Sequence, residues 1–239
     1  MAGLTVLVDH VATLREAIQT PQPDPIAAAV LADMAGADSI GVYLRDDRQH
    51  IQEKDVRLLR QTVHSRMVLY MTATSEMVGL ALDVRPERVV LMPPPGDEGT
   101  IEGGMDVFVY DKEILEVVDT LQSNGISVGI TVDPEPNQIK SVHQMHANWV
   151  QLFSGRLGAA QSPTSQGQEW DKIVDAIKMA HRLRLHIAVG GGLNYRLIKL
   201  FSGLPEIDEF SLGRSIIAKA MMVGMETAVK DMVSLIRAL

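Results

Sequence analysis

The sequence predicts an α/β protein, a single (β/α)₈ (TIM) barrel over residues 1–239. Three observations favour this fold: eight short apolar runs recur, amphipathic segments fill the gaps between them, and no change of composition marks a linker. Short runs rich in Val, Ile and Leu are typical of parallel strands buried on both faces. Strands that alternate with helices are typical of closed α/β barrels. An open doubly wound sheet is the alternative, but the near-even spacing of eight runs favours closure.

The eight apolar runs supply the predicted strands. Each is too short to form a helix on its own. They span residues 4–9, 39–45, 66–72, 88–93, 127–133, 149–155, 185–192 and 209–214.

Helical patterns lie between these runs, at residues 24–36, 111–123, 166–184 and 215–238. The first of them opens with Asp24 and Pro25, a capping residue followed by a proline in the first turn. The others carry apolar residues on one stripe.

Two segments fit neither a strand nor a helix. The longest irregular piece, residues 93–106, is expected to form a loop over the barrel mouth. Residues 155–167 are expected to be a second mobile segment.

The amino-acid composition excludes several kinds of partner and site. The chain has 239 residues and 46% apolar residues, enough for a sizeable core. It carries 22 Lys and Arg against 30 Asp and Glu, a net charge of −8, which argues against nucleic acid and anionic membranes as partners. It has no cysteine, so disulfides and thiolate metal sites are excluded. Without a long apolar run or a basic leader at its start, it is expected to be cytoplasmic.

The active site of such a barrel lies at the carboxyl ends of its strands. Glycines end the last two predicted strands, at Gly190–Gly192 and at Gly213, which Arg214 follows. Backbone N–H groups and a following helix favour phosphate or another anion there. The alternative is that these glycines only permit tight turns.

The histidines and arginines form two further clusters. Arg45, Arg48 and His50 form a basic cluster that either binds an anion or makes local salt bridges on a solvated loop. His143 and His146 lack a third ligand at a strand end, so we expect surface histidines and no metal site.

Several segments resemble the pyridoxine 5′-phosphate synthase family. The strings are VDHVATLREA at 8–17, PDP at 23–25, AGAD at 35–38, LRDDRQHI at 44–51, EGGMDV at 102–107 and LGRSIIAKAM at 212–221. The resemblance runs from residue 5 to about residue 236, almost without gaps. It implies a (β/α)₈ barrel with added helices, assembled as an octamer, that uses no metal or organic cofactor.

The family condenses 1-deoxy-D-xylulose 5-phosphate with 3-amino-2-oxopropyl phosphate, using side chains as acids and bases. The resemblance implies that this chain keeps the pentulose phosphate site. The five residues that match this site are Asp9, His10, Arg45, His50 and Thr100.

The half of the site for the amino-ketone phosphate departs from the family pattern. Leu7 replaces an Asn, Ile18 replaces an Arg and Arg214 replaces a His, whereas Gly192 and Gly213 remain. We expect the apolar replacements to weaken binding of a phosphate-bearing amine.

The positions of the family's acid–base residues also differ from the family pattern. The family's His, Glu and His are here Tyr43, Tyr70 and Gly191, and its strand-6 Glu is Gln151. A phenol, with a pKa near ~10, is a poor general base at neutral pH.

The sequence therefore predicts a small phosphorylated ligand bound in a pocket of the 1-deoxy-D-xylulose 5-phosphate type, with the synthase reaction lost. Such a chain is either a binding protein (a pseudoenzyme) or a repurposed enzyme that uses Tyr43, Tyr70 and Arg214. The alternative is an active pyridoxine 5′-phosphate synthase of vitamin B6 biosynthesis. The resemblance also implies a homo-oligomer, an octamer or a dimer. The amphipathic segment 216–239 either packs on a partner subunit or only closes the barrel after the last strand.

Overall fold

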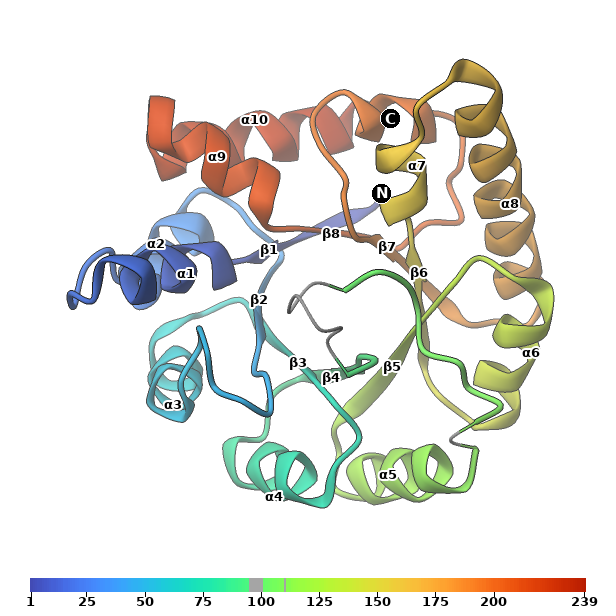
Figure 1. Ribbon diagram of the computed structural model, residues 1–239, viewed down its shortest axis with the longest axis horizontal. Coiled ribbons are helices and arrows are strands. Elements are labelled where there is room, and N and C mark those ends of the chain that lie inside the picture. The colour runs from blue at the N-terminus through green and yellow to red at the C-terminus, as the bar shows by residue number, and fades with distance from the viewer. Residues whose placement is uncertain (95–100, 110) are drawn as a thin grey trace.

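The structure is a closed barrel of eight parallel strands, which confirms the predicted fold (Figure 1). The computed structural model describes residues 1–94, 101–109 and 111–239. The strands are β1 (Gly3–Leu7), β2 (Ser39–Tyr43), β3 (Arg66–Met71), β4 (Arg88–Leu91), β5 (Ser127–Val132), β6 (Trp149–Phe153), β7 (His186–Gly190) and β8 (Glu209–Leu212). Each strand pairs with its sequence neighbours, and β1 pairs with β8 to close the ring.

Helices surround the barrel, as Figure 1 shows. They are α1 (Asp9–Ile18), α2 (Pro25–Met34), α3 (Glu53–Thr62), α4 (Ser75–Val84), α5 (Asp111–Ser123), α6 (Pro136–Gln144), α7 (Gly155–Ala159), α8 (Pro163–Arg182), a 3₁₀ helix η1 (Leu197–Phe201), α9 (Arg214–Val223) and α10 (Met225–Arg237). Among the described residues, none of these helices combines the length and apolar character that a membrane span needs.

Two expectations about helical segments need correction. The predicted helix at 215–238 is two helices, because Gly224 has a φ of 84° and interrupts the helical path between α9 and α10. The segment 155–167, expected to be irregular, is mostly helical. It holds α7 and the start of α8, where Ser162 accepts a hydrogen bond from the backbone N–H of Ser165.

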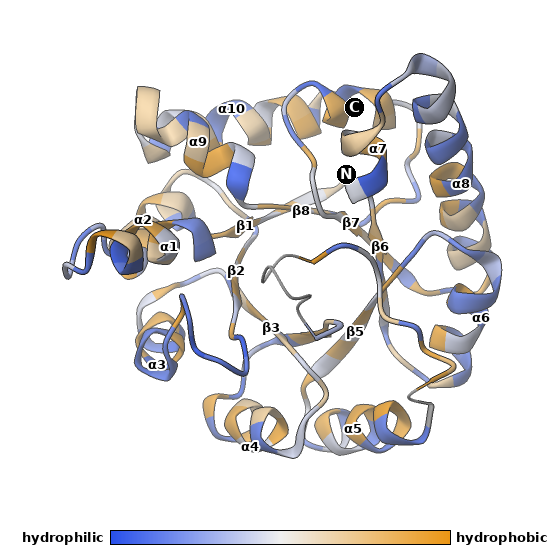
Figure 2. Ribbon diagram, viewed as in Figure 1, coloured by the Kyte–Doolittle hydropathy of each residue, from blue (hydrophilic) through white to orange (hydrophobic). Residues whose placement is uncertain are grey.

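The apolar core has two parts. The larger part lies between the strands and the surrounding helices. The smaller part fills the inside of the barrel with Val68, Tyr70, Val90 and Met92. In Figure 2 the loop between β2 and α3 is hydrophilic, as expected for an exposed segment beside the mouth.

A charged pair lies inside the barrel at the amino ends of the strands. Arg88 on β4 forms a buried ion pair with Glu209 on β8. The Arg88 guanidinium also lies 4.1 Å from the centre of the Trp149 ring, a cation–π contact. Both side chains are buried, so they fill part of the barrel interior near the amino ends of the strands.

Four side chains repeat one contact at the amino ends, and we call these contacts the amino-end clamps. In each, the residue just before an even-numbered strand accepts a hydrogen bond from the backbone N–H of the second residue of the preceding strand. The pairs are Asp38 with Leu4 (2.8 Å), Glu87 with Met67 (2.8 Å), Asn148 with Val128 (2.9 Å) and Asp208 with Ile187 (2.8 Å). The clamps join the strands two by two, at the end opposite the mouth.

Candidate active site

Asp9 and His10 form the first turn of α1, directly after β1. The Asp9 carboxylate accepts a hydrogen bond from the backbone N–H of Tyr43 at 2.5 Å, which connects the ends of β1 and β2. Burial raises the pKa of Asp9 to about 7, and the hydrogen bond from Tyr43 offsets part of this rise. Asp9 therefore exchanges a proton near neutral pH.

His10 lies within the electrostatic reach of two other predicted site residues. Burial of the imidazole lowers the pKa of His10, and the charges of Arg214 and His50 lower it further. The structure thus brings together residues that follow β1, β2 and β8. The mouth gathers basic groups, which is what an anionic ligand requires.

Arg45 is a buried cation at the end of β2, only 5% exposed. Its Nε and Nη2 donate to the two carboxylate oxygens of Asp47 at 2.9 and 2.6 Å, so the guanidinium plane is fixed. Burial lowers the pKa of His50, and the charge of Arg45 lowers it further while Asp47 opposes this. Arg45, Asp47 and His50 therefore form one electrostatic group.

The basic cluster predicted from the sequence, Arg45, Arg48 and His50, divides into residues with different partners. Arg48 forms ion pairs with Glu53 (2.9 Å) and Glu76 (2.5 Å), and its guanidinium also donates to the backbone carbonyls of Arg45 (3.4 Å) and Asp46 (2.9 Å). For Arg48 the local salt-bridge alternative therefore holds, and we exclude it from the candidate site.

A buried arginine on α1 supports the loop that carries His50. Arg15 donates to both oxygens of Asp55 at 3.0 and 2.7 Å and to the backbone carbonyl of His50 at 3.0 Å. This contact holds the end of the β2–α3 loop against α1.

The two tyrosines at acid–base positions have different surroundings. Tyr43 is half-buried at the rim, its phenol donates to the Pro93 carbonyl at 3.5 Å, and burial raises its pKa to about 12. Tyr70 is fully buried inside the barrel, where it hydrogen-bonds with Ser211 Oγ (2.9 Å) and Gln151 Oε1 (3.2 Å). Burial raises the pKa of Tyr70 further still. The repurposed use of Tyr70 as an acid–base group is therefore unfavourable, because its phenol is neutral and has partners.

Phe153 covers the third acid–base position. Gly191 has a φ of 86°, and a Cβ placed on it would lie 2.7 Å from two ring carbons of Phe153. Gly192, with a φ of 73°, packs so closely on Gly155 that a Cβ would lie 3.2 Å from its Cα. The Ser154 hydroxyl hydrogen-bonds with the Gly190 and Gly191 carbonyls (2.9 and 2.7 Å) and fixes this turn.

The other glycine turn starts α9. Gly213 is the N-cap of α9, and Arg214 is its exposed first residue. Leu7 packs against this turn: a Cβ on Gly213 would lie 3.1 Å from the Cβ of Leu7. Ile18, expected beside the mouth, is instead exposed at the far end of α1, about 13 Å along the helix from Asp9.

The segment after β4 is anchored by Asp133. The Asp133 carboxylate accepts from the backbone N–H of Gly104 (3.1 Å) and from Arg156 (2.9 Å). A Cβ on Gly104 would lie 2.1 Å from the backbone nitrogen of Asp133, so only glycine fits there. Thr100, predicted to bind the sugar phosphate, lies outside the described residues.

Sequence reasoning missed the roles of Asp47 and Phe153. The signal for Asp47 is its position two residues after Arg45, which suits a salt bridge within a loop. Phe153 carries no local signal, because its contact with Gly191 joins two strands. Among the described residues, the structure contains no group of three or more His, Cys, Asp or Glu suited to a metal ion.

Solved structures share the fold at low sequence identity. A phosphoribosylanthranilate isomerase from Thermotoga maritima matches with a TM-score of 0.62 and 13% identity, over all of both chains. A thiamine phosphate pyrophosphorylase from Pyrococcus furiosus matches with a TM-score of 0.64 and 13% identity, over 99% of this chain and 96% of that one. These likenesses support the barrel fold alone.

Sequence relatives are much more similar. The family model "Pyridoxal phosphate biosynthesis protein PdxJ" matches residues 4–238. A protein of Desulforapulum autotrophicum named pyridoxine 5′-phosphate synthase is 46% identical over all of both chains. One of the same name from Desulfatibacillum aliphaticivorans is 45% identical over 99% of both. The chain therefore belongs to the pyridoxine 5′-phosphate synthase family.

Proposed function

We propose that this chain has a pyridoxine 5′-phosphate synthase-like function in which a sugar phosphate of the 1-deoxy-D-xylulose 5-phosphate type binds at the mouth. The observation that carries the proposal is the grouping of Asp9, His10, Arg45 and His50 around the ends of β1 and β2. Arg45 supplies a buried, always-charged donor for a phosphate. His50 and His10 supply neutral or charged imidazole donors, according to pH.

The anion must compete with Asp47 for Arg45. In the structure both carboxylate oxygens of Asp47 accept from this guanidinium. Asp47 is exposed on the loop, so it can turn to water when a phosphate replaces it. This exchange conserves the charge pairing of Arg45 and avoids leaving a buried cation without a partner.

We further propose that the chain lacks the family's acid–base route. The supporting observations are the raised pKa values of Tyr43 and Tyr70, the burial of Tyr70, and the Phe153 ring in front of Gly191. Loss of one positioned acid or base costs about 10²–10⁴ in rate. Ligand binding without synthesis of pyridoxine 5′-phosphate is the expected behaviour.

An active pyridoxine 5′-phosphate synthase is the second candidate. The relatives' names and their 45–46% identity favour it, and those comparisons support it more directly than they support a lost reaction. An active synthase would need acid–base groups other than Tyr43 and Tyr70. Asp9 is a candidate, because its pKa of about 7 lies near neutral pH.

Calorimetric titration with 1-deoxy-D-xylulose 5-phosphate separates these candidates. We expect saturable binding that Arg45→Ala abolishes and that Arg57→Ala, a change of an exposed arginine on α3, leaves intact. Absence of binding to the parent chain would overturn the proposal.

The same sample then receives 3-amino-2-oxopropyl phosphate and is assayed for pyridoxine 5′-phosphate. Binding without product supports the lost acid–base route. Product at a steady rate establishes the active synthase. Conversion of the pentulose phosphate without the amine would indicate a repurposed enzyme.

A further inference from the structure

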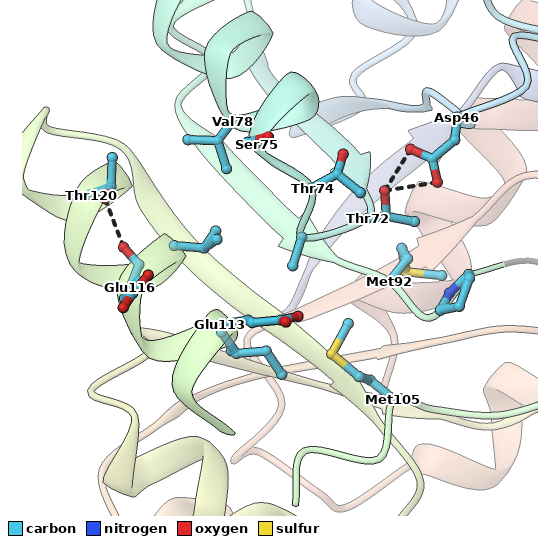
Figure 3. Close-up of a pocket in the computed structure, with 14 residues that line it drawn as sticks. Asp46, Thr72, Thr74, Ser75, Val78, Met92, Met105, Glu113, Glu116 and Thr120 are labelled. Atoms are coloured by element: carbon cyan, nitrogen blue, oxygen red, sulfur yellow. Dashed lines mark hydrogen bonds between the residues drawn. The ribbon is translucent and has the colours of Figure 1, made fainter. Parts of the chain in front are cut away.

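A cavity lies between α4 and α5 and reaches Met92 of the smaller core (Figure 3). Its volume is about 540 Å³, within the roughly 300–1,000 Å³ of small-molecule sites. It opens at the carboxyl ends of β3 and β4, and the described residues that line it include none of the residues assigned to the sugar phosphate.

The walls of this cavity are apolar. Val78 comes from α4 and Val117 from α5, and both are at most 9% exposed. Two thioethers, those of Met92 and Met105, form the side nearest the barrel. Flexible methionines adapt to ligands of different shape. Such walls suit a short hydrocarbon body.

The polar groups of the cavity are acceptors with negative charge. Figure 3 shows the Glu113 carboxylate directed toward Met105 and the Asp46 carboxylate at the opposite end. Asp46 is oriented by the buried hydroxyl of Thr72, which lies 2.7 and 3.0 Å from its two oxygens. Glu116 adds a third carboxylate to the lining.

Arg45 lies within electrostatic reach of Asp46 but is not part of the lining. None of the described lining residues is Lys, Arg or His. The sequence places no basic residue at 95–100 or 110 either, so the parts of the chain that the structure does not describe add no positive charge. The cavity therefore disfavours phosphates and favours a positive charge, in contrast to the mouth with Arg45 and His50.

We propose that this cavity binds a small organic cation, a primary ammonium group on a short apolar chain. The ammonium donates to the Glu113 carboxylate. The hydrocarbon part lies between Val78 and Val117. The site differs from the mouth in charge and in residues, so it does not depend on the function proposed above.

Methyl NMR titration with butylammonium, butanol and butyl phosphate tests the proposal. These probes share one hydrocarbon chain and differ in the charge of the head group. We expect butylammonium to shift the methyl signals of Val78 and Val117 in a saturable way, and to bind at least about threefold tighter than butanol. Butyl phosphate should leave both signals unchanged.

Two matched variants on α5 complete the test. Glu113→Gln should remove the preference for butylammonium over butanol, whereas Asp119→Asn, the same change at an exposed residue outside the lining, should preserve it. Both substitutions are at exposed positions, so folding is not at risk. Equal binding of amine and alcohol, a preference for butyl phosphate, or an unchanged preference in Glu113→Gln would each overturn the proposal.

Discussion

The ring of Phe153 lies where a side chain on residue 191 would begin. Two of its carbons are 2.7 Å from the position of a Cβ on Gly191, and its tip carbon Cζ is 2.3 Å from the position of a Cβ on Gly155. A histidine, the residue that the family resemblance implies at this position, would therefore collide with the ring. The neighbouring strand has filled its space.

A histidine introduced at residue 191 without any other change should destabilise the fold. We expect Gly191→His to lower the free energy of unfolding by about 2–4 kcal/mol, from the clash with Phe153 and from the positive φ. In combination with Phe153→Ala the cost should be smaller than the sum of the single changes by at least about 0.5 kcal/mol. Urea unfolding of the four proteins measures this coupling. Exact additivity would show that the ring moves aside freely.

Tyr70 should behave as a structural residue. We expect Tyr70→Phe to lower the free energy of unfolding by about 1 kcal/mol, because Ser211 and Gln151 lose a buried partner. Affinity for 1-deoxy-D-xylulose 5-phosphate should not change. Tyr195→Phe, which removes a phenol that donates to the Ala228 carbonyl at 2.7 Å, is the matched control. A selective loss of ligand affinity or turnover in Tyr70→Phe would assign its phenol to the site.

Asp9 should make stability depend on pH between about 4 and 7. Its folded pKa of about 7 lies above the ~3.9 of an unfolded chain, so the folded state binds the proton more tightly. Its contribution is therefore fully present below pH ~4 and is lost as the pH rises through about 7.

Asp9→Asn keeps an acceptor for the Tyr43 N–H and removes the titration. We expect this variant to be more stable than the parent by about 1–3 kcal/mol at pH 8, with the difference falling to near zero at pH 4. Urea unfolding at several pH values checks the slope. A difference independent of pH would contradict the assignment.

The amino-end clamps should make similar and additive contributions to the free energy of unfolding. We expect Asp38→Ala to lower the free energy of unfolding by about 1 kcal/mol and Asp38→Asn to be nearly neutral, since Asn148 makes the same contact with an amide oxygen. Asp38→Ala and Asn148→Ala should add, because separate strand pairs hold them. Thermal unfolding of the single and double variants is the measurement.

Most of the fold could be predicted from the sequence, because it rests on local patterns. Each buried strand is a short apolar run, and Asp24 with Pro25 starts α2 as expected. The break at Gly224 could not be found, because the apolar stripe continues across it and only the φ of 84° interrupts the helix.

The sequence names candidate site residues but not their geometry. Motifs identified Asp9, His10, Arg45 and His50, whereas the partner of Arg45 and the burial of Tyr70 depend on contacts across loops and strands. Ile18 shows the same limit, since sequence similarity assigned it to a site from which the length of α1 separates it.

The amino-end clamps lie apart from the residues of the candidate site. They join the eight strands into four pairs at the end of the barrel opposite the mouth. None of the four contacts involves Asp9, His10, Arg45 or His50. The chemistry of the mouth can therefore change by substitution without loss of the contacts that hold each strand pair at the amino end.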